Sequence, residues 1–190
     1  PRISGIEMLH LLVAGCRTSP SAFYKILKDA YDEILERNIP EQASKPRIMV
    51  YGCIIDDEFV FQLIEESDAH VVIDDTCIGT RIYSNDIEIT EDPMDGLAKC
   101  YFSDFVCPRT VKTTDNSRFD YIKDYISLFR VDGVIIYAMD FCSPHKFDIP
   151  SIRDYLHENG TPTLYIENNY NLANYGAMKT RIQAFIELLN

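Results

Sequence analysis

Several features that mark whole classes of protein are missing from this sequence of 190 residues. No apolar run approaches the ~20 residues that a membrane-spanning helix needs, so no membrane segment is expected. Lysine and arginine form no cluster and the net charge is −12, which argues against a nucleic-acid partner because phosphates bind to basic patches. Glycine- or serine-rich tracts, which are typical of disordered linkers, are absent as well. The composition, 46% apolar and 25% charged, is that of an ordinary globular domain.

Familiar cofactor motifs are also missing. Neither GxGxxG nor GxxxxGK[ST] occurs, so nucleotide binding by those loops is not supported. No CxxC occurs, and the cysteine spacing matches neither zinc ribbons, ferredoxin runs nor a dense secreted disulfide scaffold. The sequence therefore predicts a cytoplasmic protein with free thiols, most of them buried as small apolar residues. The six cysteines are Cys16, Cys53, Cys77, Cys100, Cys107 and Cys142.

The first part of the chain has the pattern of a helical hairpin. Ser4 and Glu7 form a capping-box pattern that opens a helix over residues 4–15. Ser19 followed by Pro20 opens a second helix, which we expect to run to about residue 37. We divide the chain at this point into a helical hairpin, residues 1–45, and an α/β domain, residues 46–190.

Apolar residues on the first helix have little obvious cover nearby in the sequence. We expect them to form part of an extended interface with another subunit. They are Met8, Leu9, Leu11 and Leu12.

From residue 47 onward, short apolar runs alternate with amphipathic stretches. The runs predict strands at 48–52, 70–73, 133–138 and 162–166, and the stretches predict helices at 56–67, 93–105, 117–130, 149–159 and 176–189. Short apolar strands separated by helices are typical of a parallel sheet covered on both faces. The predicted fold is a doubly wound α/β domain, of the Rossmann or flavodoxin-like kind, preceded by the helical hairpin.

Three cysteines follow three of the predicted strands. Cys53 follows the first strand, Cys77 the second and Cys142 the third. Ligands of open parallel sheets bind just beyond the carboxyl ends of the strands, so we expect these thiols at one edge. Cys100 falls inside a predicted helix and Cys107 in a loop, where neither has an evident partner.

Three interpretations of that edge remain open from the residues alone. Thiolates could bind a metal ion or an iron–sulfur cluster. Cys142 and His145 could form a nucleophilic Cys–His pair. The cysteines could also be small buried residues at strand ends, as free cysteines commonly are.

Two charged elements of the same edge also have open alternatives. The pair Asp74-Asp75 could bind Mg²⁺ or cap backbone N–H groups. Arg81 could face an anionic ligand or take part in a structural ion pair.

The chain resembles the C-terminal part of a subunit of the 2-hydroxyacyl-CoA dehydratase family, which includes 2-hydroxyglutaryl-CoA dehydratase and is related to benzoyl-CoA reductase. Two motifs, D-D-x-C-x-G-[ST]-R and F-C-x-P-H, are specific in combination. The segments that carry the resemblance are Ile3-Ser4-Gly5, Tyr51-Gly52-Cys53-Ile54-Ile55-Asp56-Asp57, Asp74-Asp75-Thr76-Cys77-Ile78-Gly79-Thr80-Arg81, Phe141-Cys142-Ser143-Pro144-His145 and Thr180-Arg181-Ile182-Gln183-Ala184-Phe185-Ile186-Glu187.

The resemblance implies an anaerobic lyase built from two related subunits, each holding a [4Fe-4S] cluster through three cysteines. It also implies a separate ATP-hydrolysing iron–sulfur activator that injects one electron. That electron reduces the thioester of an (R)-2-hydroxyacyl-CoA to a ketyl radical anion, hydroxide leaves, and loss of the β-proton gives an enoyl-CoA.

Carried over by motif, Cys77 and Cys142 are cluster ligands. The third ligand of the family normally lies in an N-terminal domain that this sequence lacks. We therefore favour a fragment, which we expect to be inactive in isolation. The alternatives are a shortened member of the family and a chain in which Cys53 supplies the third thiolate. The partner is expected to be the related second subunit, in a heterodimer, or a second copy, in a homodimer.

Other functions remain open beside the dehydratase. Benzoyl-CoA reductase-like subunits and double-cubane-cluster reductases share the scaffold that the resemblance implies. The Ser-Pro-His sequence after Cys142 favours the dehydratase branch. A non-catalytic α/β module that uses its edge for contact between subunits is the alternative of another class.

Overall fold

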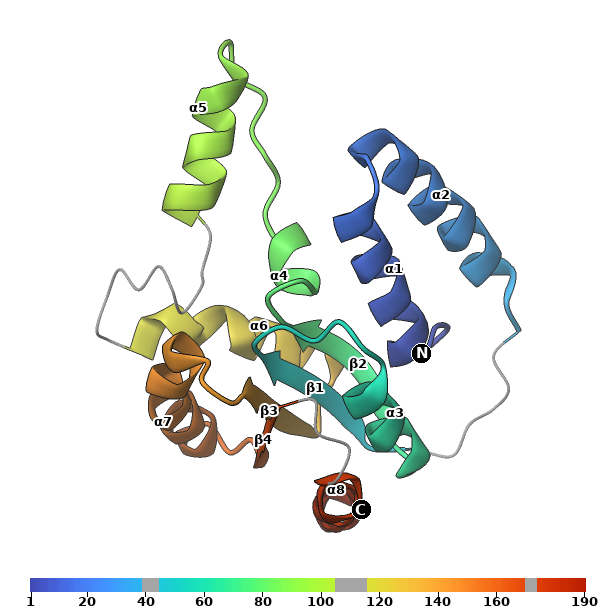
Figure 1. Ribbon diagram of the computed structural model, residues 1–190, viewed down its shortest axis with the longest axis vertical. Coiled ribbons are helices and arrows are strands. Elements are labelled where there is room, and N and C mark those ends of the chain that lie inside the picture. The colour runs from blue at the N-terminus through green and yellow to red at the C-terminus, as the bar shows by residue number, and fades with distance from the viewer. Residues whose placement is uncertain (39–44, 105–115, 170–173) are drawn as a thin grey trace.

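Four parallel strands form the central sheet of the chain (Figure 1). The computed structural model describes residues 1–38, 45–104, 116–169 and 174–190. The strand order is β2-β1-β3-β4, with each neighbouring pair parallel. The predicted doubly wound α/β fold is therefore confirmed. The strands are β1 (Arg47–Gly52), β2 (His70–Asp75), β3 (Gly133–Met139) and β4 (Thr163–Asn168).

Helices connect and cover these strands. Two helices precede the sheet, α1 (Gly5–Arg17) and α2 (Pro20–Glu36). Four longer elements alternate with the strands or follow them: α3 (Phe59–Glu66), α6 (Asp120–Phe129), α7 (Ser143–Glu158) and α8 (Tyr175–Leu189). Between β2 and α6 lie α4 (Thr80–Tyr83), α5 (Pro93–Ala98), a π-helical segment η1 (Lys99–Asp104) and a 3₁₀ turn η3 (Asn116–Phe119). In Figure 1, α5 stands apart from the sheet and its covering helices.

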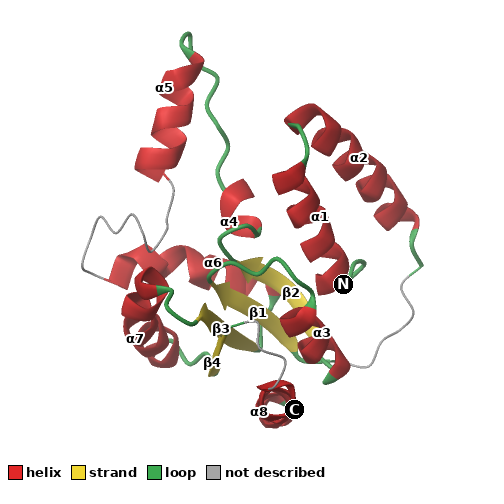
Figure 2. Cartoon of the chain, viewed as in Figure 1, coloured by secondary structure: helices red, strands yellow, loops and turns green. Residues whose placement is uncertain are grey.

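The sheet separates two apolar clusters, because successive side chains of a strand point to opposite faces. Ile48 and Val50 of β1 pack in one cluster with side chains of α1, α3 and α8. Met49 and Tyr51 pack in the other with side chains of α6 and α7. The sheet is thus covered by helices on both faces, as Figure 2 shows.

The N-terminal helix begins as its capping box predicts. The Ser4 hydroxyl accepts a hydrogen bond from the Glu7 N–H at 3.1 Å, and the Ser4 N–H donates to the Glu7 carboxylate at 2.9 Å. The second helix also begins as predicted, with the Ser19 side chain as cap and Pro20 in the first turn.

The expectation that the apolar residues of α1 lack local cover is wrong for two of them. Leu9 is 2% exposed and Leu12 is 8% exposed. Leu9 belongs to the buried cluster that contains Phe61 and Val71, so α1 packs on α3 and β2. The cover comes from residues about sixty positions away, which is why no local pattern indicated it.

Helix α7 begins earlier than predicted. Ile149-Pro150 had the pattern of a helix start, but α7 begins at Ser143, and Pro150 lies inside it on the exposed side. Pro144 occupies the first turn, where no N–H is needed for the helix. Cys142 therefore lies at the N-cap of a helix rather than in a long loop.

Two other helix boundaries differ from the prediction. Helix α3 begins at Phe59, whose N–H donates to the Asp57 carboxylate at 3.0 Å, so Asp57 turns the chain before the helix instead of opening it. The stretch predicted as one helix from Pro93 changes to a π-helical segment at Lys99. The short helix α4 was not predicted.

The buried position of Leu9 gives a test of the packing of α1. Leu9→Ala should lower the free energy of unfolding by about 2–5 kcal/mol, because it leaves a cavity between α1, α3 and β2. Leu188→Ala removes the same atoms from a side chain that is 84% exposed and should change it by less than about 0.5 kcal/mol. Chemical denaturation of both variants measures the difference, and equal effects would contradict this packing.

Candidate functional site

The candidate site lies where the direction of strand addition reverses. From β1 the chain passes to β2 on one side and then to β3 on the other, so the switch point lies between β1 and β3. Cys53 directly follows β1, and Cys142 lies three residues beyond β3. The Met139 N–H of β3 donates to Cys53 Sγ at 2.9 Å and joins the two strand ends. Ligands of open α/β sheets bind at this position.

A hollow of about 480 Å³ opens at this edge. The three cysteines that the sequence places after strands all line it, so the prediction that they share one edge of the sheet is confirmed. Its remaining lining is mostly apolar. The lining residues are Cys53, Ile54, Cys77, Ile78, Met139, Asp140, Phe141, Cys142, Pro144 and His145.

The loop that carries Cys77 is held by the carboxylate of Asp74. This carboxylate accepts hydrogen bonds from the Thr76 and Thr80 hydroxyls, each at 2.8 Å, and from their backbone N–H groups. A side chain at Gly79 would overlap the same carboxylate, so only glycine fits there. Asp74 thus acts as a cap, one of the two roles expected for it, and fixes the loop that brings Cys77 to the hollow.

Asp75 and Arg81 form a buried ion pair next to Cys77. Arg81 Nε donates to Asp75 Oδ1 at 2.9 Å, and Nη2 donates to Oδ2 at 3.0 Å and to the Asp75 carbonyl at 2.6 Å. The Tyr121 hydroxyl donates to Asp75 Oδ2 at 2.7 Å, and the guanidinium lies 5.4 Å from the ring centre of Tyr51. Burial alone would lower the pKa of Arg81, but the Asp75 carboxylate outweighs it and raises that pKa.

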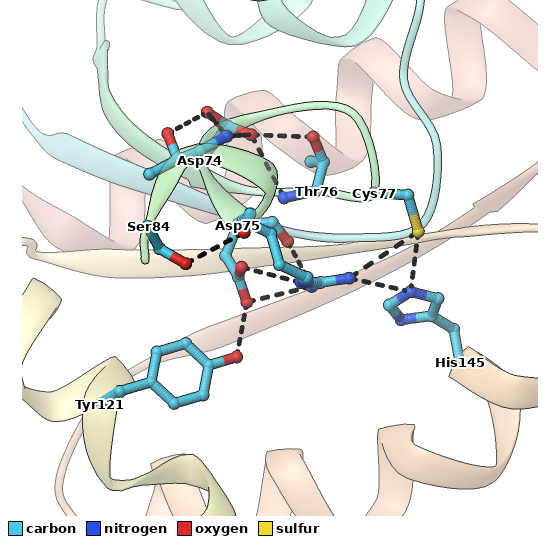
Figure 3. A network of polar contacts seen from close by, with 9 residues as sticks. Asp74, Asp75, Thr76, Cys77, Ser84, Tyr121 and His145 are labelled. Carbon is cyan, nitrogen blue, oxygen red and sulfur yellow. Dashed lines mark hydrogen bonds and ion pairs between the residues drawn. The ribbon is translucent and has the colours of Figure 1, made fainter. Parts of the chain in front are cut away.

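The third nitrogen of the Arg81 guanidinium contacts two residues that line the hollow. Nη1 lies 3.7 Å from Cys77 Sγ and 3.4 Å from His145 Nε2. His145 Nε2 itself lies 3.5 Å from Cys77 Sγ (Figure 3). The three groups therefore meet. The ring of His145, which is 3% exposed, packs edge-on against Tyr51. His145 thus contacts Cys77, whereas the sequence suggested a pair with Cys142.

Cys53 forms the buried floor of the hollow. It is 1% exposed, and burial raises the pKa of its thiol to about 12. Charge on Cys142 or Cys77 raises that pKa further, since both sulfurs lie close enough to interact with it. Cys77 and Cys142 are both only partly buried and therefore more accessible than Cys53.

Comparison with known proteins assigns the family. A model described as 2-hydroxyglutaryl-CoA dehydratase, D-component, matches residues 1–189. The chain belongs to this 2-hydroxyglutaryl-CoA dehydratase D-component family. The resemblance found in the sequence is therefore confirmed.

Curated relatives of the D-component family include subunits of several enzymes. The chain is 29% identical to the (R)-phenyllactyl-CoA dehydratase beta subunit of Clostridium sporogenes over 89% of its length and 46% of the relative's. It is 23% identical to (R)-2-hydroxyglutaryl-CoA dehydratase subunit beta of Acidaminococcus fermentans, over 88% and 47%. It is 29% identical to a benzoyl-CoA reductase subunit of Thauera aromatica, over 88% and 45%. The chain spans about half the length of these relatives.

Other cysteines of this D-component chain lie away from the hollow. Cys16 is exposed, with Sγ 3.9 Å from the Ile78 carbonyl and from the Tyr83 hydroxyl. Cys100 is 5% exposed and lies within η1. Cys107 lies outside the described residues. The hollow therefore gathers Cys53, Cys77 and Cys142 and neither Cys16 nor Cys100.

Two negative results apply to the part of the chain that is described. Its histidine, cysteine and acidic side chains include no group of three or more that could surround a single metal ion. Within the same ranges, no helix combines the length and the apolar character that crossing a bilayer requires.

Sequence reasoning missed two residues of the site, Tyr51 and Tyr121. Tyr51 lies in an apolar strand and Tyr121 in an amphipathic helix, and aromatic residues in such elements usually belong to the core. A signal did exist for Tyr51, which directly precedes the Gly-Cys pair of a family motif. Tyr121 lies 46 residues from Asp75, so no local pattern links the two.

Phe141 has an unusual backbone at the mouth of the hollow. Its φ is +67°, in the left-handed region, and its side chain is 93% exposed. For an L-residue with a side chain this conformation costs roughly 1–2 kcal/mol. The turn directs the chain into α7 and brings Cys142 to the hollow.

The conformation of Phe141 can be tested by paired substitutions. Phe141→Gly should be more stable than Phe141→Ala by about 1 kcal/mol, because glycine adopts positive φ without strain. The matched pair is Phe147, also exposed (84%) but inside α7. There the order should reverse, with glycine about 1 kcal/mol less stable than alanine. Thermal or denaturant unfolding measures the stability of the four variants. The same order of glycine and alanine at both positions would contradict the left-handed turn.

Proposed function

We propose that this chain is the cluster-binding part of a 2-hydroxyacyl-CoA dehydratase subunit and that Cys77 and Cys142 are ligands of a [4Fe-4S] cluster. The observation that carries the proposal is the meeting of three thiols at one hollow on the switch point of the sheet. Family membership supports the reaction class. The names of two of its relatives, both dehydratase beta subunits, support the same class.

The donor set fits an iron–sulfur cluster better than a single ion. Cysteine thiolates are soft ligands, which favour iron–sulfur clusters, zinc or Cu(I) over magnesium or calcium. A mononuclear site needs its donors around one ion, and the described residues contain no such group of three. In a cluster each cysteine binds a different iron, so its ligands need only surround a common space. The hollow lined by Cys53, Cys77 and Cys142 is such a space.

The partly buried cysteines are better placed as ligands than Cys53. Ligation requires a thiolate, and burial raises the pKa of the Cys53 thiol to about 12. Cys53 is therefore a weaker candidate ligand than Cys77 and Cys142. It competes for the third position with a cysteine from elsewhere in the assembly.

The proposed reaction converts a 2-hydroxyacyl-CoA into an enoyl-CoA by loss of the hydroxyl from the α-carbon and of a proton from the β-carbon. The cluster, when bound, would supply one electron to the thioester and recover it, so the reaction has no net redox change. The chain itself would hold the thiolates in place and surround them with apolar side chains that exclude water. The substrate would approach from the open side of the hollow.

We further propose that the chain works in an assembly with a related subunit and receives its electron from an ATP-dependent iron–sulfur activator. The names of the relatives, as beta subunits, support a partner subunit. Helix α2 supports it as well, because several of its large apolar or aromatic side chains are exposed, among them Tyr24 (67%), Tyr31 (61%) and Leu35 (52%).

A reductase is the second candidate function, supported by the 29% identity to the benzoyl-CoA reductase subunit. It would use the same cluster ligands and differ in what accepts the electron. Assay of the assembled protein with 2-hydroxyacyl-CoA and with benzoyl-CoA separates the two, since only the dehydratase gives an enoyl-CoA without consuming reductant in proportion to product.

The ligand assignment is tested by cysteine substitutions in the assembled protein, purified without oxygen. Cys77→Ala and Cys142→Ala should each lower bound iron and acid-labile sulfide severalfold and reduce the iron–sulfur absorbance. Cys100→Ala is the matched control, because it removes a buried thiol that lies outside the hollow, and its iron content should equal that of the parent.

The substitution Cys53→Ala distinguishes the two sources of the third thiolate. Loss of iron would identify Cys53 as a ligand, and retention of iron would assign the third position to another cysteine of the assembly. Parental iron content in Cys77→Ala or Cys142→Ala would contradict the proposed site.

A further inference from the structure

Arg81 is more than a structural partner of Asp75, because their pairing leaves Nη1 of its guanidinium available for contacts with other residues. The carboxylate and carbonyl of Asp75 occupy Nε and Nη2 of Arg81. The remaining nitrogen, Nη1, lies 3.4 Å from His145 Nε2 and 3.7 Å from Cys77 Sγ, the latter within the distance of a hydrogen bond to sulfur. One rigid, planar group therefore connects a buried carboxylate to the sulfur of a proposed ligand.

We propose that Arg81 is a positioning residue for Cys77, which holds its sulfur toward the hollow and stabilises the reduced state of the bound cluster. The inference rests on the proposed function. Asp75 fixes the plane of the guanidinium, and Tyr121 fixes Asp75 in turn through its hydroxyl. His145 completes the surroundings of the sulfur, with Nε2 at 3.5 Å.

Burial makes this contact effective. Arg81 is 3% exposed and Asp75 is 1% exposed, so water screens their charges little. Hydrogen bonds to the sulfurs of iron–sulfur clusters are one of the protein's means of setting the reduction potential. A donor that carries positive charge favours the more negative, reduced state. Arg81 should accordingly raise the reduction potential of the cluster.

Lysine could not replace arginine in this role. A guanidinium presents donors in a fixed fork and reaches two acceptors at once, whereas an ammonium is a single point charge on a flexible stem. Arg81→Lys therefore keeps the charge but cannot pair bidentately with Asp75 and reach Cys77 Sγ at the same time. Arg81→Lys therefore tests the geometry of the guanidinium while it leaves the positive charge in place.

The experiment is a redox titration of the assembled protein, followed by electron paramagnetic resonance, together with iron analysis and an unfolding measurement. Arg81→Lys should shift the reduction potential to a more negative value. The double variant Asp75→Asn/Arg81→Gln should shift it further in the same direction. The double variant removes one negative and one positive charge, so no buried charge is left unpaired. Partial loss of iron from either folded variant would also support the proposal, since the sulfur would have lost its position.

Two controls isolate the contact with sulfur. Arg118→Lys alters another Arg–Asp pair, in which Arg118 is partly buried and lies 2.5 Å from the buried Asp148, and should lower stability while leaving the potential unchanged. Tyr121→Phe removes one hydrogen bond to Asp75 and leaves Nη1 in place, so it should change the potential less than Arg81→Lys does.

Three results would overturn the inference. A parental potential and full iron content in both Arg81 variants would leave the proposed function intact and refute the role of Arg81. An equal shift in Arg118→Lys would also refute it, because the effect would then be a general one of buried charge. Absence of iron from the unmodified protein would refute the proposed function and this inference together.

Discussion

The parallel direction of all four strands is the constraint on which the rest of the site depends. Since every strand ends at the same edge, the segments that leave β1, β2 and β3 emerge beside one another. Cysteines that lie 24 and 65 residues apart in the sequence, Cys53, Cys77 and Cys142, are thereby brought to one hollow. The strands themselves are apolar and buried, so the chemistry lies in the loops that follow them.

A second constraint is the burial of charge directly behind the hollow. An unpaired carboxylate or guanidinium at 1–3% exposure would be strongly unfavourable, and removal of one member of such a pair typically costs about 3–5 kcal/mol. Asp75 avoids that cost by accepting from Arg81 and Tyr121 at the same time. Asp74, next to it, satisfies its carboxylate within its own loop. The two adjacent acids therefore have different roles. Asp74 shapes the loop of Cys77, and Asp75 holds the guanidinium that contacts the Cys77 sulfur.

The sequence was sufficient for features that depend on near neighbours. The capping box of Ser4 and Glu7, the cap at Ser19 and the four strands all follow from short patterns, and the structure has them. It was insufficient where distant residues decide. Leu9 is covered by Val71 and Phe61, which lie far from it in the sequence. The start of α7 was misplaced for a local reason, because both Pro144 and Pro150 have the pattern of a first helical turn and the structure uses the first. For Arg81 the residues alone left an ion pair and an anion site equally open, and only the folded loop, with Tyr121 beside it, shows the ion pair.

The most direct test of the account is the iron and acid-labile sulfide content of the assembled protein after purification without oxygen, with Mössbauer spectroscopy to identify the cluster type. The account predicts a [4Fe-4S] spectrum with iron and sulfide in equal amounts, at about one cluster for each copy of this chain. Iron-free protein that is folded and assembled would contradict it. In that case Cys77, Cys142 and Cys53 would be buried structural residues of an interaction module.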